Sequence, residues 1–419
     1  MSVYRRRVMQ VKHPPNQITA VYNVTSTTSA TKLFYRYYNK SLIQKVIVDG
    51  ETINQSVADH QTYTFLTTGL HEVVLIVNGG AESIEGLFYQ AEDLVSVDFQ
   101  MCKNTWSNVS ALFDSCYKLE EVKGLHLTNS VQKCRSMCRY CYALNIANIE
   151  GLESWDLSNV TNMSAMFYEC KVSTDLTPLA NWDVSNVTNM ESMLGACAFR
   201  NLTPLANWDV SNVTNMSGIL SNNKKLTDIT GLANWDVSNV TNMNRILNSC
   251  SSLKNLSGLE NWDISKVTDL GWAFGYCNAL SNISAVSQWD TNKVKTIEGL
   301  LASDYGLTDI TPIANWDVSN VTSIYYTFYK CTKLTKIDIS AWDLSKVKNM
   351  EYAFYKTTSL VELRLNTEIN TSPGIYSSTF QDAGTSTPTL YYYPHASFVE
   401  KFLPKVPAKW TKIDITTLE

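Results

Sequence analysis

The feature that most constrains this chain is a Trp-Asp pair that recurs at nearly constant spacing. The pair occurs eight times in the 419 residues, and successive copies are 26 or 27 residues apart. A fixed period of this length is typical of repeat proteins, in which each unit buries its apolar side only against its neighbours. We therefore expect a solenoid in which the repeated tryptophans are structural: Trp155, Trp182, Trp208, Trp235, Trp262, Trp289, Trp316 and Trp342.

A second apolar column follows each Trp by about 12 residues and extends further in both directions, from Phe88 to Phe380, which gives about twelve coils. Six residues after this position the sequence alternates, as at 334–339 and 360–365, which predicts a short β-strand. Between the Trp-Asp pair and this strand, the phrase Val-Thr-Asn-Met-x-x-Met-Phe has apolar residues at helical spacing. We therefore expect a short helix in each coil, with the preceding Asp or Ser as its N-cap.

These units resemble the BspA-like leucine-rich repeats, in particular the subgroup W-D-x-S-x-V-T-x-M-x-x-M-F-x-x-C that occurs on bacterial surface lipoproteins. The resemblance covers about residues 84–385. It implies an α+β repeat, a leucine-rich-repeat-like solenoid of about twelve coils of 25–29 residues. Cys138, Asn223 and Asp304 depart from the pattern, so we expect those coils to deviate locally.

The chain divides by pattern into four parts. Residues 1–15 form a basic arm, 16–80 a small β-sandwich, 81–385 the solenoid and 386–419 a C-terminal cap. The second part has β-type runs at 17–24, 32–38, 42–48, 62–66 and 71–77, and the last two predict a hairpin. The residues at 63–65 and 69–73 are similar to the closing strands of immunoglobulin-like domains. The cap, a strand, short helix and strand, would cover the apolar end of the last coil.

Composition excludes several classes of protein. Only 17% of the residues are charged, and the net charge of -5 gives no broad field for nucleic acid. No stretch reaches the ~18 apolar residues of a membrane helix. No apolar core of a signal peptide follows Arg5, Arg6 and Arg7, so we expect synthesis in a cytoplasm, where the ten cysteines stay reduced.

Cysteines offer two candidate sites. Cys134, Cys138 and Cys141 have the spacing of an iron–sulfur triad, but the latter two already occupy repeat positions. The other candidate is a column three residues after the apolar position, which could bind metal or cross-link. Stacked thiols of this kind more often act as small buried hydrophobes, so we expect a structural role. The column comprises Cys116, Cys141, Cys170, Cys197, Cys250, Cys277 and Cys331.

An Asp column accompanies the tryptophans. Carboxylates on adjacent coils about 5 Å apart would suit a retaining glycosidase, and calcium is a further alternative. Because an Asp recurs in every coil with Ser commonly two residues later, we expect turn capping instead. The histidines His13, His60, His71, His126 and His395 lack a nearby nucleophile, and the Asn-Val-Thr sequons at Asn159, Asn186, Asn212, Asn239 and Asn320 are interpreted as turn residues. We expect no catalytic residue, no cofactor and no metal.

Tyrosines give the candidate contact surface. They gather in coils ten and eleven at Tyr325, Tyr326, Tyr329, Tyr352 and Tyr355. Tyr is enriched at recognition surfaces because it offers a large contact area at low entropy cost. A packing stripe between coils is the alternative interpretation.

Function is expected to be binding or structural, without catalysis. Our hypothesis is a phage virion-associated protein, in a tail or head appendage, made in the host cytoplasm. Its N-terminal region would contact other virion proteins, and its solenoid would contact a protein or glycan of the host surface. The alternatives are a bacterial cell-surface adhesin and a phage polysaccharide depolymerase. We expect no nucleic acid and no membrane insertion, while a homo-oligomer stays open.

Overall fold

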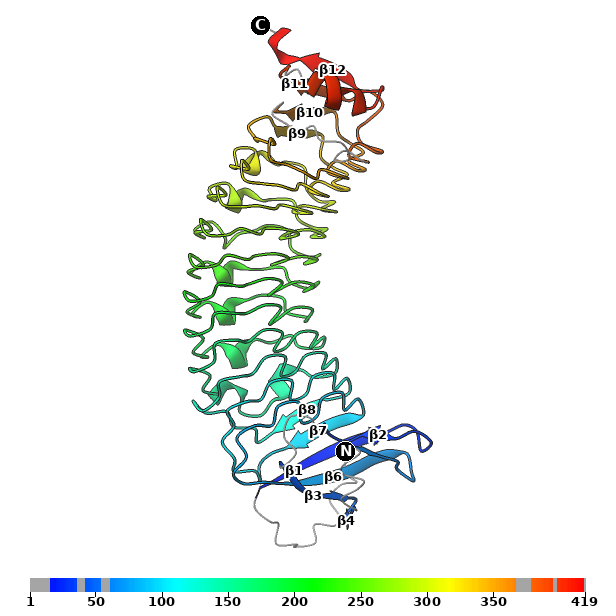
Figure 1. Ribbon diagram of the computed structural model, residues 1–419, viewed down its shortest axis with the longest axis vertical. Helices are drawn as coiled ribbons and strands as arrows, with labels where there is room; N and C mark the ends of the chain where they lie inside the picture. The colour runs from blue at the N-terminus through cyan, green and yellow to red at the C-terminus, as the bar shows by residue number, and fades with distance from the viewer. Residues whose placement is uncertain (1–15, 36–41, 54–60, 367–377, 395–397, 418–419) are drawn as a thin grey trace. The chain divides into compact units, whose positions relative to one another are not determined.

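The computed structural model describes residues 16–35, 42–53, 61–366, 378–394 and 398–417 (Figure 1). The basic arm and His13, His60 and His395 lie outside the described residues. The chain forms two compact units. The first comprises Met1–Val160 and Glu169–Ser173, and the second comprises Thr161–Tyr168 and Thr174–Glu419. The boundary that we predicted near residue 80 therefore falls inside the first unit.

The first unit contains a six-stranded sheet in the order β4-β3-β6-β1-β7-β8. Its strands are β1 (Gln17–Val24), β3 (Ile43–Val48), β4 (Glu51–Thr52), β6 (Gly69–Val77), β7 (Leu94–Asp98) and β8 (Glu121–Lys123). β1 lies antiparallel to both β6 and β7, whereas β7 and β8 are parallel. Because β7 and β8 belong to the first coils, the N-terminal strands extend the sheet of the repeat. Over the described residues of this region, the expected separate immunoglobulin-like sandwich is therefore not confirmed.

The predicted hairpin between 62–66 and 71–77 is also wrong. β5 (Thr62–Tyr63) pairs with β2 (Thr31–Lys32), while β6 pairs with β1 and β3. Beyond the end of β5 at Tyr63, the ring of Phe65 is buried 4.3 Å from the ring of His71, and the next residue, Leu66, has 91% of its surface exposed. Pairing with strands that are distant in sequence therefore replaces the pairing between β5 and β6 that the local sequence predicts.

The described residues contain no α-helix, so the predicted helix in each coil is wrong. The structure has one π-turn, η8 (Phe398–Phe402), and short 3-10 turns, most of which lie just before the Trp-Asp pairs. These 3-10 turns are η1 (Ile146–Asn148), η2 (Leu152–Ser154), η3 (Thr177–Leu179), η4 (Thr203–Leu205), η5 (Thr230–Leu232), η6 (Ser284–Val286), η7 (Thr311–Ile313), η9 (Leu403–Lys405) and η10 (Ile415–Thr417).

In place of the helix, each coil has two consecutive tight turns. In one coil, the amide of Met166 donates to the carbonyl of Met163 at 3.2 Å, and Ala165, the third residue of that turn, has φ 53°. Alternate amides donate to the next coil instead, as from Ala165 to Glu191 at 2.7 Å. The turns bury residues at intervals of three, one and three, which is also the spacing of a helix face. The apolar pattern alone therefore cannot separate the two structures.

The Trp side chains of the second unit stack in two runs, Trp182–Trp208–Trp235 and Trp262–Trp289–Trp316. The rings of Trp182 and Trp208 are 6.5 Å apart with 2° between their planes, and both side chains are buried. The Nε1 of Trp208 donates to the carbonyl of Leu179 in the preceding coil at 2.9 Å. Each indole thus fills the core and satisfies a main-chain carbonyl of its neighbour.

The second unit ends in a four-stranded parallel sheet, in the order β12-β11-β10-β9 (Figure 1). Its strands are β9 (Lys336–Ile339), β10 (Glu362–Leu365), β11 (Thr389–Tyr392) and β12 (Thr411–Asp414). In earlier coils the predicted strand shrinks to one bridge, such as that between Asn201 and Asp228, because a 3-10 turn begins directly afterwards. At the C-terminal end, η8 and η9 lie between β11 and β12, and Trp410 packs against Phe380 of the last coil.

A candidate recognition surface on the late coils

Each coil has two residues in the left-handed conformation, and in most coils they are small or polar. In four late coils they are large instead: Arg245, Trp272, Tyr326 and Tyr352 at the first position, and Tyr276, Lys330 and Lys356 at the second, with φ between 55° and 62°. A left-handed residue other than Gly costs about 1–2 kcal/mol, and bulky residues rarely adopt it. Turn formation alone does not explain their concentration here.

The aromatic residues of these coils form one cluster, which we call the late-coil platform. Tyr326 lies at its centre, with its ring 4.2 Å from Tyr325, 4.4 Å from Tyr329 and 4.9 Å from Tyr352. The rings of Tyr329 and Tyr355 are stacked at 5.1 Å. The structure therefore brings together all five tyrosines of the predicted contact surface. The platform consists of Trp272, Tyr276, Tyr325, Tyr326, Tyr329, Tyr352 and Tyr355.

Trp272 and Tyr276, which lie outside the Trp-Asp column, were not among the predicted contact residues. Their rings are stacked at 5.8 Å, and Trp272 is 5.9 Å from Tyr326, two coils further on. The indole spans this distance because it lies over Gly299, where a Cβ atom would stand 2.3 Å from the ring. The 27-residue offset between Trp272 and Gly299 was the available signal.

Three cations border the platform, each beside a ring. The guanidinium of Arg245 lies 5.5 Å from Trp272, and the ammonium groups of Lys330 and Lys356 lie 4.9 and 5.3 Å from Tyr329 and Tyr355. The hydrogen bond with Tyr329 raises the pKa of Lys330, so this side chain is charged at neutral pH. Most of the platform is half-buried, whereas Tyr276 is 40% exposed.

The Asp column serves its own turns. The Oδ1 atom of Asp183 accepts hydrogen bonds from the amide and the hydroxyl of Ser185 at 3.0 and 2.6 Å. The equivalent side-chain hydrogen bond from Ser211 lowers the pKa of Asp209. Over the residues that the structure describes, no group of three His, Cys, Asp or Glu side chains is placed to hold a metal ion. The carboxylates cap turns, as the recurrence of Ser two residues later predicts.

The Cys column donates hydrogen bonds to main-chain carbonyls of the preceding coil. Cys277 donates to Leu247 at 3.2 Å, and Cys331 donates to Leu301 at 3.0 Å. All ten cysteines are free, and nine are buried. Burial raises the pKa of Cys250 to about 12. These thiols are donors inside the core rather than nucleophiles.

The remaining polar candidates also have structural partners. Sequon amides form a ladder, as when Asn212 and Asn239 donate to the carbonyls of Ser185 and Ser211 at 2.8 Å. His71, which is buried, contacts Asp49 at 2.7 Å and the carbonyl of Thr67 at 2.9 Å. His126 is exposed.

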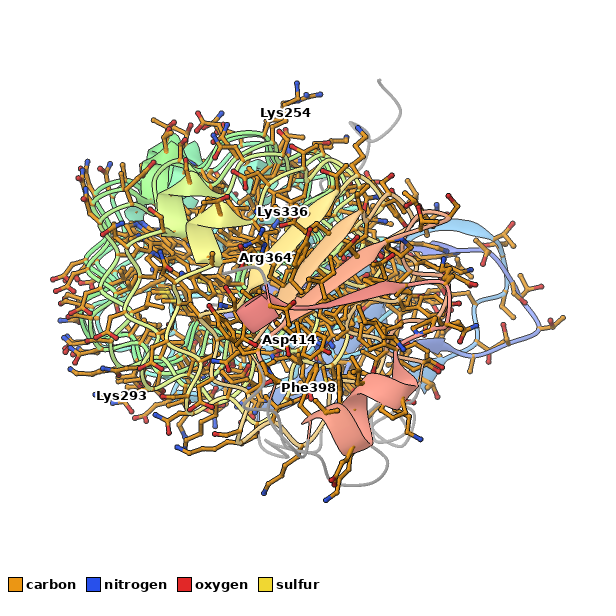
Figure 2. The ribbon with its side chains drawn as sticks, turned by 90° about the horizontal axis from the view of Figure 1, so that it is seen from above. Lys254, Lys293, Lys336, Arg364, Phe398 and Asp414 are labelled. Atoms are coloured by element: carbon orange, nitrogen blue, oxygen red, sulfur yellow. The ribbon has the colours of Figure 1, made fainter. Side chains whose placement is uncertain are left out.

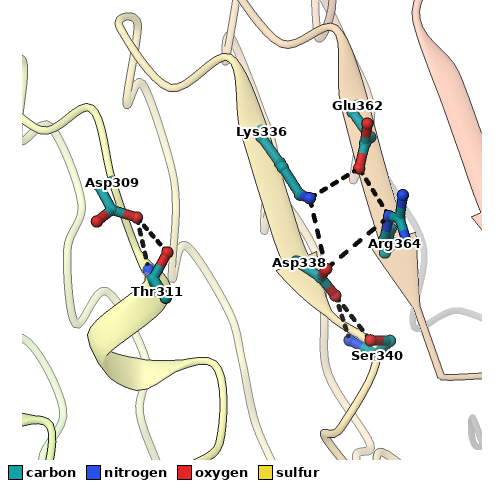
Figure 3. A network of polar contacts seen from close by, with 7 residues as sticks. All are labelled: Asp309, Thr311, Lys336, Asp338, Ser340, Glu362 and Arg364. Carbon is teal, nitrogen blue, oxygen red and sulfur yellow. Dashed lines mark hydrogen bonds and ion pairs between the residues drawn. The ribbon is translucent and has the colours of Figure 1, made fainter.

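The strongest charge cluster is on the C-terminal parallel sheet, where four charges neutralise one another (Figure 3). Glu362 contacts Lys336 at 3.1 Å and Arg364 at 2.6 Å, and Asp338 lies within 4 Å of the same two cations. Although burial opposes it, hydrogen bonding to Arg364 and Lys336 lowers the pKa of Glu362. The network therefore offers no unpaired charge to a ligand.

These observations define a β-solenoid of stacked coils with an aromatic surface on its late coils. The family described as "Mycoplasma protein of unknown function, DUF285" matches residues 82–201, 132–256, 195–297 and 270–386. The matches cover more than half of the chain, so the protein belongs to this family. No curated protein matches the sequence. In the described part of the chain, no helix is long and apolar enough to cross a membrane.

Solved structures that resemble the protein include two bacterial leucine-rich repeat proteins. A leucine-rich repeat protein from Bacteroides ovatus is 14% identical, with a TM-score of 0.34 over 74% of this chain and 88% of that one. A leucine rich cell surface protein from Faecalibacterium prausnitzii is 15% identical, with a TM-score of 0.31 over 71% and 86%.

Proposed function

We propose that this protein is a non-enzymatic recognition protein that binds a macromolecule of a bacterial surface through the late-coil platform. One observation carries the proposal. Bulky residues are concentrated at the left-handed turn positions of four late coils, whereas small or polar residues occupy most of the equivalent positions in the other coils. Strain of this kind marks sites selected for something other than stability. The stacked core beneath holds the rings in place before binding, which lowers the entropy cost of recognition.

Catalysis is not part of the proposal. The Asp column, which offered the best pair of carboxylates, is engaged in turn caps such as that between Asp183 and Ser185. The remaining strong candidates, the thiols of the Cys column, are buried. Both observations favour a scaffold over a depolymerase.

The setting that we propose is a phage virion, where the first unit would dock to the particle. An exposed apolar turn in that unit supports a docking role, since Leu66 and Leu70 are 91% and 46% exposed. His71, which contacts Thr67 and Asp49, fixes this turn. Mass spectrometry of purified phage particles tests the setting. Finding the protein on intact cells that produce no phage would favour the adhesin instead.

Recognition itself is tested with the labelled full-length protein on a panel of intact, capsulated bacteria. Tyr326→Asn with Tyr352→Asn removes two central rings while keeping a residue that tolerates the left-handed conformation. The matched control is Tyr140→Asn, because Tyr140 has the same kind of turn position, with φ 60°, outside the platform. We expect about a tenfold or greater loss of cell binding for the double variant only. Equal binding by all three proteins would overturn the proposal.

The non-enzymatic part has its own test. Purified protein is incubated with capsular polysaccharide from a bound strain, and reducing ends are counted against a heat-denatured sample. We expect equal counts. New reducing ends would establish a depolymerase.

A further inference from the structure

We infer that the ligand of the late-coil platform is an acidic polysaccharide, whose carboxylate groups pair with Lys330 and Lys356 while its sugar hydroxyls contact the tyrosines. The inference rests on the proposed function and specifies its ligand class. It starts from the two residue types that share the platform, which are aromatic rings and cations.

The three cations at the platform are held in position but not neutralised. Arg245, Lys330 and Lys356 occupy the same left-handed turns as the aromatic residues and lie beside rings. Among the described residues, none of the three takes part in a salt bridge. Lys336 and Arg364, by contrast, are both paired with carboxylates (Figure 3). The platform therefore presents positive charge that is available to an anionic ligand.

The spacing of the cations suits a polymer that runs along the stack. Lys330 and Lys356 stand at the same position of adjacent coils, so one coil step, about 4.8 Å, separates their backbones. This step is comparable with the length of one sugar residue. A polysaccharide aligned with the coils would place successive sugar residues beside successive lysines, so an acid group on either residue would lie near a cation.

The arrangement of the rings favours sugars over nucleotide bases. Tyr329 and Tyr355 are stacked on each other, and Trp272 is covered by Tyr276 and Gly299. Stacked rings offer edges and hydroxyls to a ligand rather than free faces. Base recognition depends on free ring faces, whereas tyrosine hydroxyls both donate and accept hydrogen bonds, as sugar hydroxyls do.

Charge density points the same way. Glu351 lies in the same coil as Lys356, and Glu298 lies at the equivalent position of the coil between Trp272 and Tyr326, where it accepts a hydrogen bond from Ser323 at 2.5 Å. Three cations and two carboxylates leave the surface only modestly positive, on a protein with a net charge of -5. This balance suits a polymer with acid groups on some of its residues. A nucleic acid, with a phosphate at every step, would meet more repulsion.

The experiment measures binding of the full-length protein to immobilised polymers. The probes are hyaluronan, alginate, polygalacturonate, carboxyl-reduced hyaluronan, dextran and oligo-dT. We expect retention by at least one acidic polysaccharide and about a tenfold loss with Lys330→Gln and Lys356→Gln together. The control pair, Lys254→Gln and Lys293→Gln, removes two exposed lysines that extend outward from other coils (Figure 2) and should bind normally.

Several results would overturn the inference. These are retention of no acidic polysaccharide, equal retention of the carboxyl-reduced polymer, tighter retention of oligo-dT, or equal binding by the two lysine pairs. If cell binding nevertheless requires Tyr326 and Tyr352, recognition through the platform stands and only the acidic ligand is wrong. If cell binding is insensitive to the tyrosines, the proposed function itself fails.

Discussion

At the scale of single residues, Asp304 is the exception that explains its column. It occupies a position where most coils carry a Cys that donates to a main-chain carbonyl of the preceding coil. Asn223 preserves that role, since its amide donates to Leu194 at 2.8 Å. A carboxylate cannot donate, and both oxygens of Asp304 are buried without a partner. Burial accordingly raises the pKa of Asp304 well above its ordinary value, which favours the protonated acid.

Asp304→Asn is therefore predicted to stabilise the protein at neutral pH. The folded pKa of Asp304 lies above the unfolded one, so its favourable contribution is present below about pH 4 and is lost as the pH rises toward the folded pKa. The amide donates at any pH, so the variant should gain about 1–3 kcal/mol at pH 7 and less at pH 4. Urea unfolding at both pH values measures the difference.

A second substitution in the same coil serves as the control. Asp309 is exposed and caps the turn at Thr311, accepting hydrogen bonds at 2.8 and 2.5 Å (Figure 3). Asp309→Asn should not stabilise the protein at either pH. A pH-independent gain from Asp304→Asn would contradict the protonated state that we assign to Asp304.

At the scale of the coil, the stacked tryptophans carry both packing and hydrogen bonding. Trp235 lies 6.2 Å from Trp208 and donates to the carbonyl of Leu205 at 3.0 Å. Trp235→Phe should lower the free energy of unfolding by about 2–4 kcal/mol, because it leaves both a void and an unpaired buried carbonyl. The control is Trp272→Phe on the half-buried platform, where the loss should be about 1 kcal/mol. The thermal unfolding midpoints of both variants measure this difference. Equal shifts would contradict a special role for the Trp column.

The coil also shows which features of the structure could be predicted from its sequence. The period, the buried Trp and Phe columns and the late strands at 336–339 and 362–365 follow from spacing alone. The helix prediction was wrong, because a pair of tight turns buries Met163, Met166, Phe167 and Cys170 at the same intervals as a helix would. The helix and the pair of tight turns differ in the acceptor of every second main-chain amide, which in the tight turns is a carbonyl of the next coil. A pattern within one coil does not contain that information.

Only some residues of the candidate site could likewise be predicted from the sequence. Its tyrosines were found because they stand out within a repeating column. Trp272, Tyr276 and the cations were missed because their significance depends on the left-handed backbone and on Gly299, which leaves space for an indole from the preceding coil. Departures from the repeat therefore indicate a surface site only when the backbone conformation of the turns is known.

At the scale of the whole molecule, the reactivity of the native cysteines measures whether the core is intact, without an introduced label. Only Cys102 of the ten is not buried, and burial raises the pKa of thiols such as Cys134, to about 12. We expect an aromatic disulfide reagent to titrate one thiol in the native protein and ten in guanidinium, since only exposed thiolates react. Cys102→Ser should leave none reactive in the native state. Rapid reaction of several thiols would show that the stacked core opens in solution.

The near identity of neighbouring coils has a genetic consequence. The ten residues that begin at Asn181, Asn207 and Asn234 are the same, and each of these coils offers its neighbours the same amides and carbonyls. The gene segment for one coil can thus be duplicated or deleted by unequal crossing-over, and the new junction still joins matching surfaces. Such events would change reach in whole steps of about 27 residues while leaving the platform intact. A lineage can in this way adjust how far its binding surface extends without redesigning it.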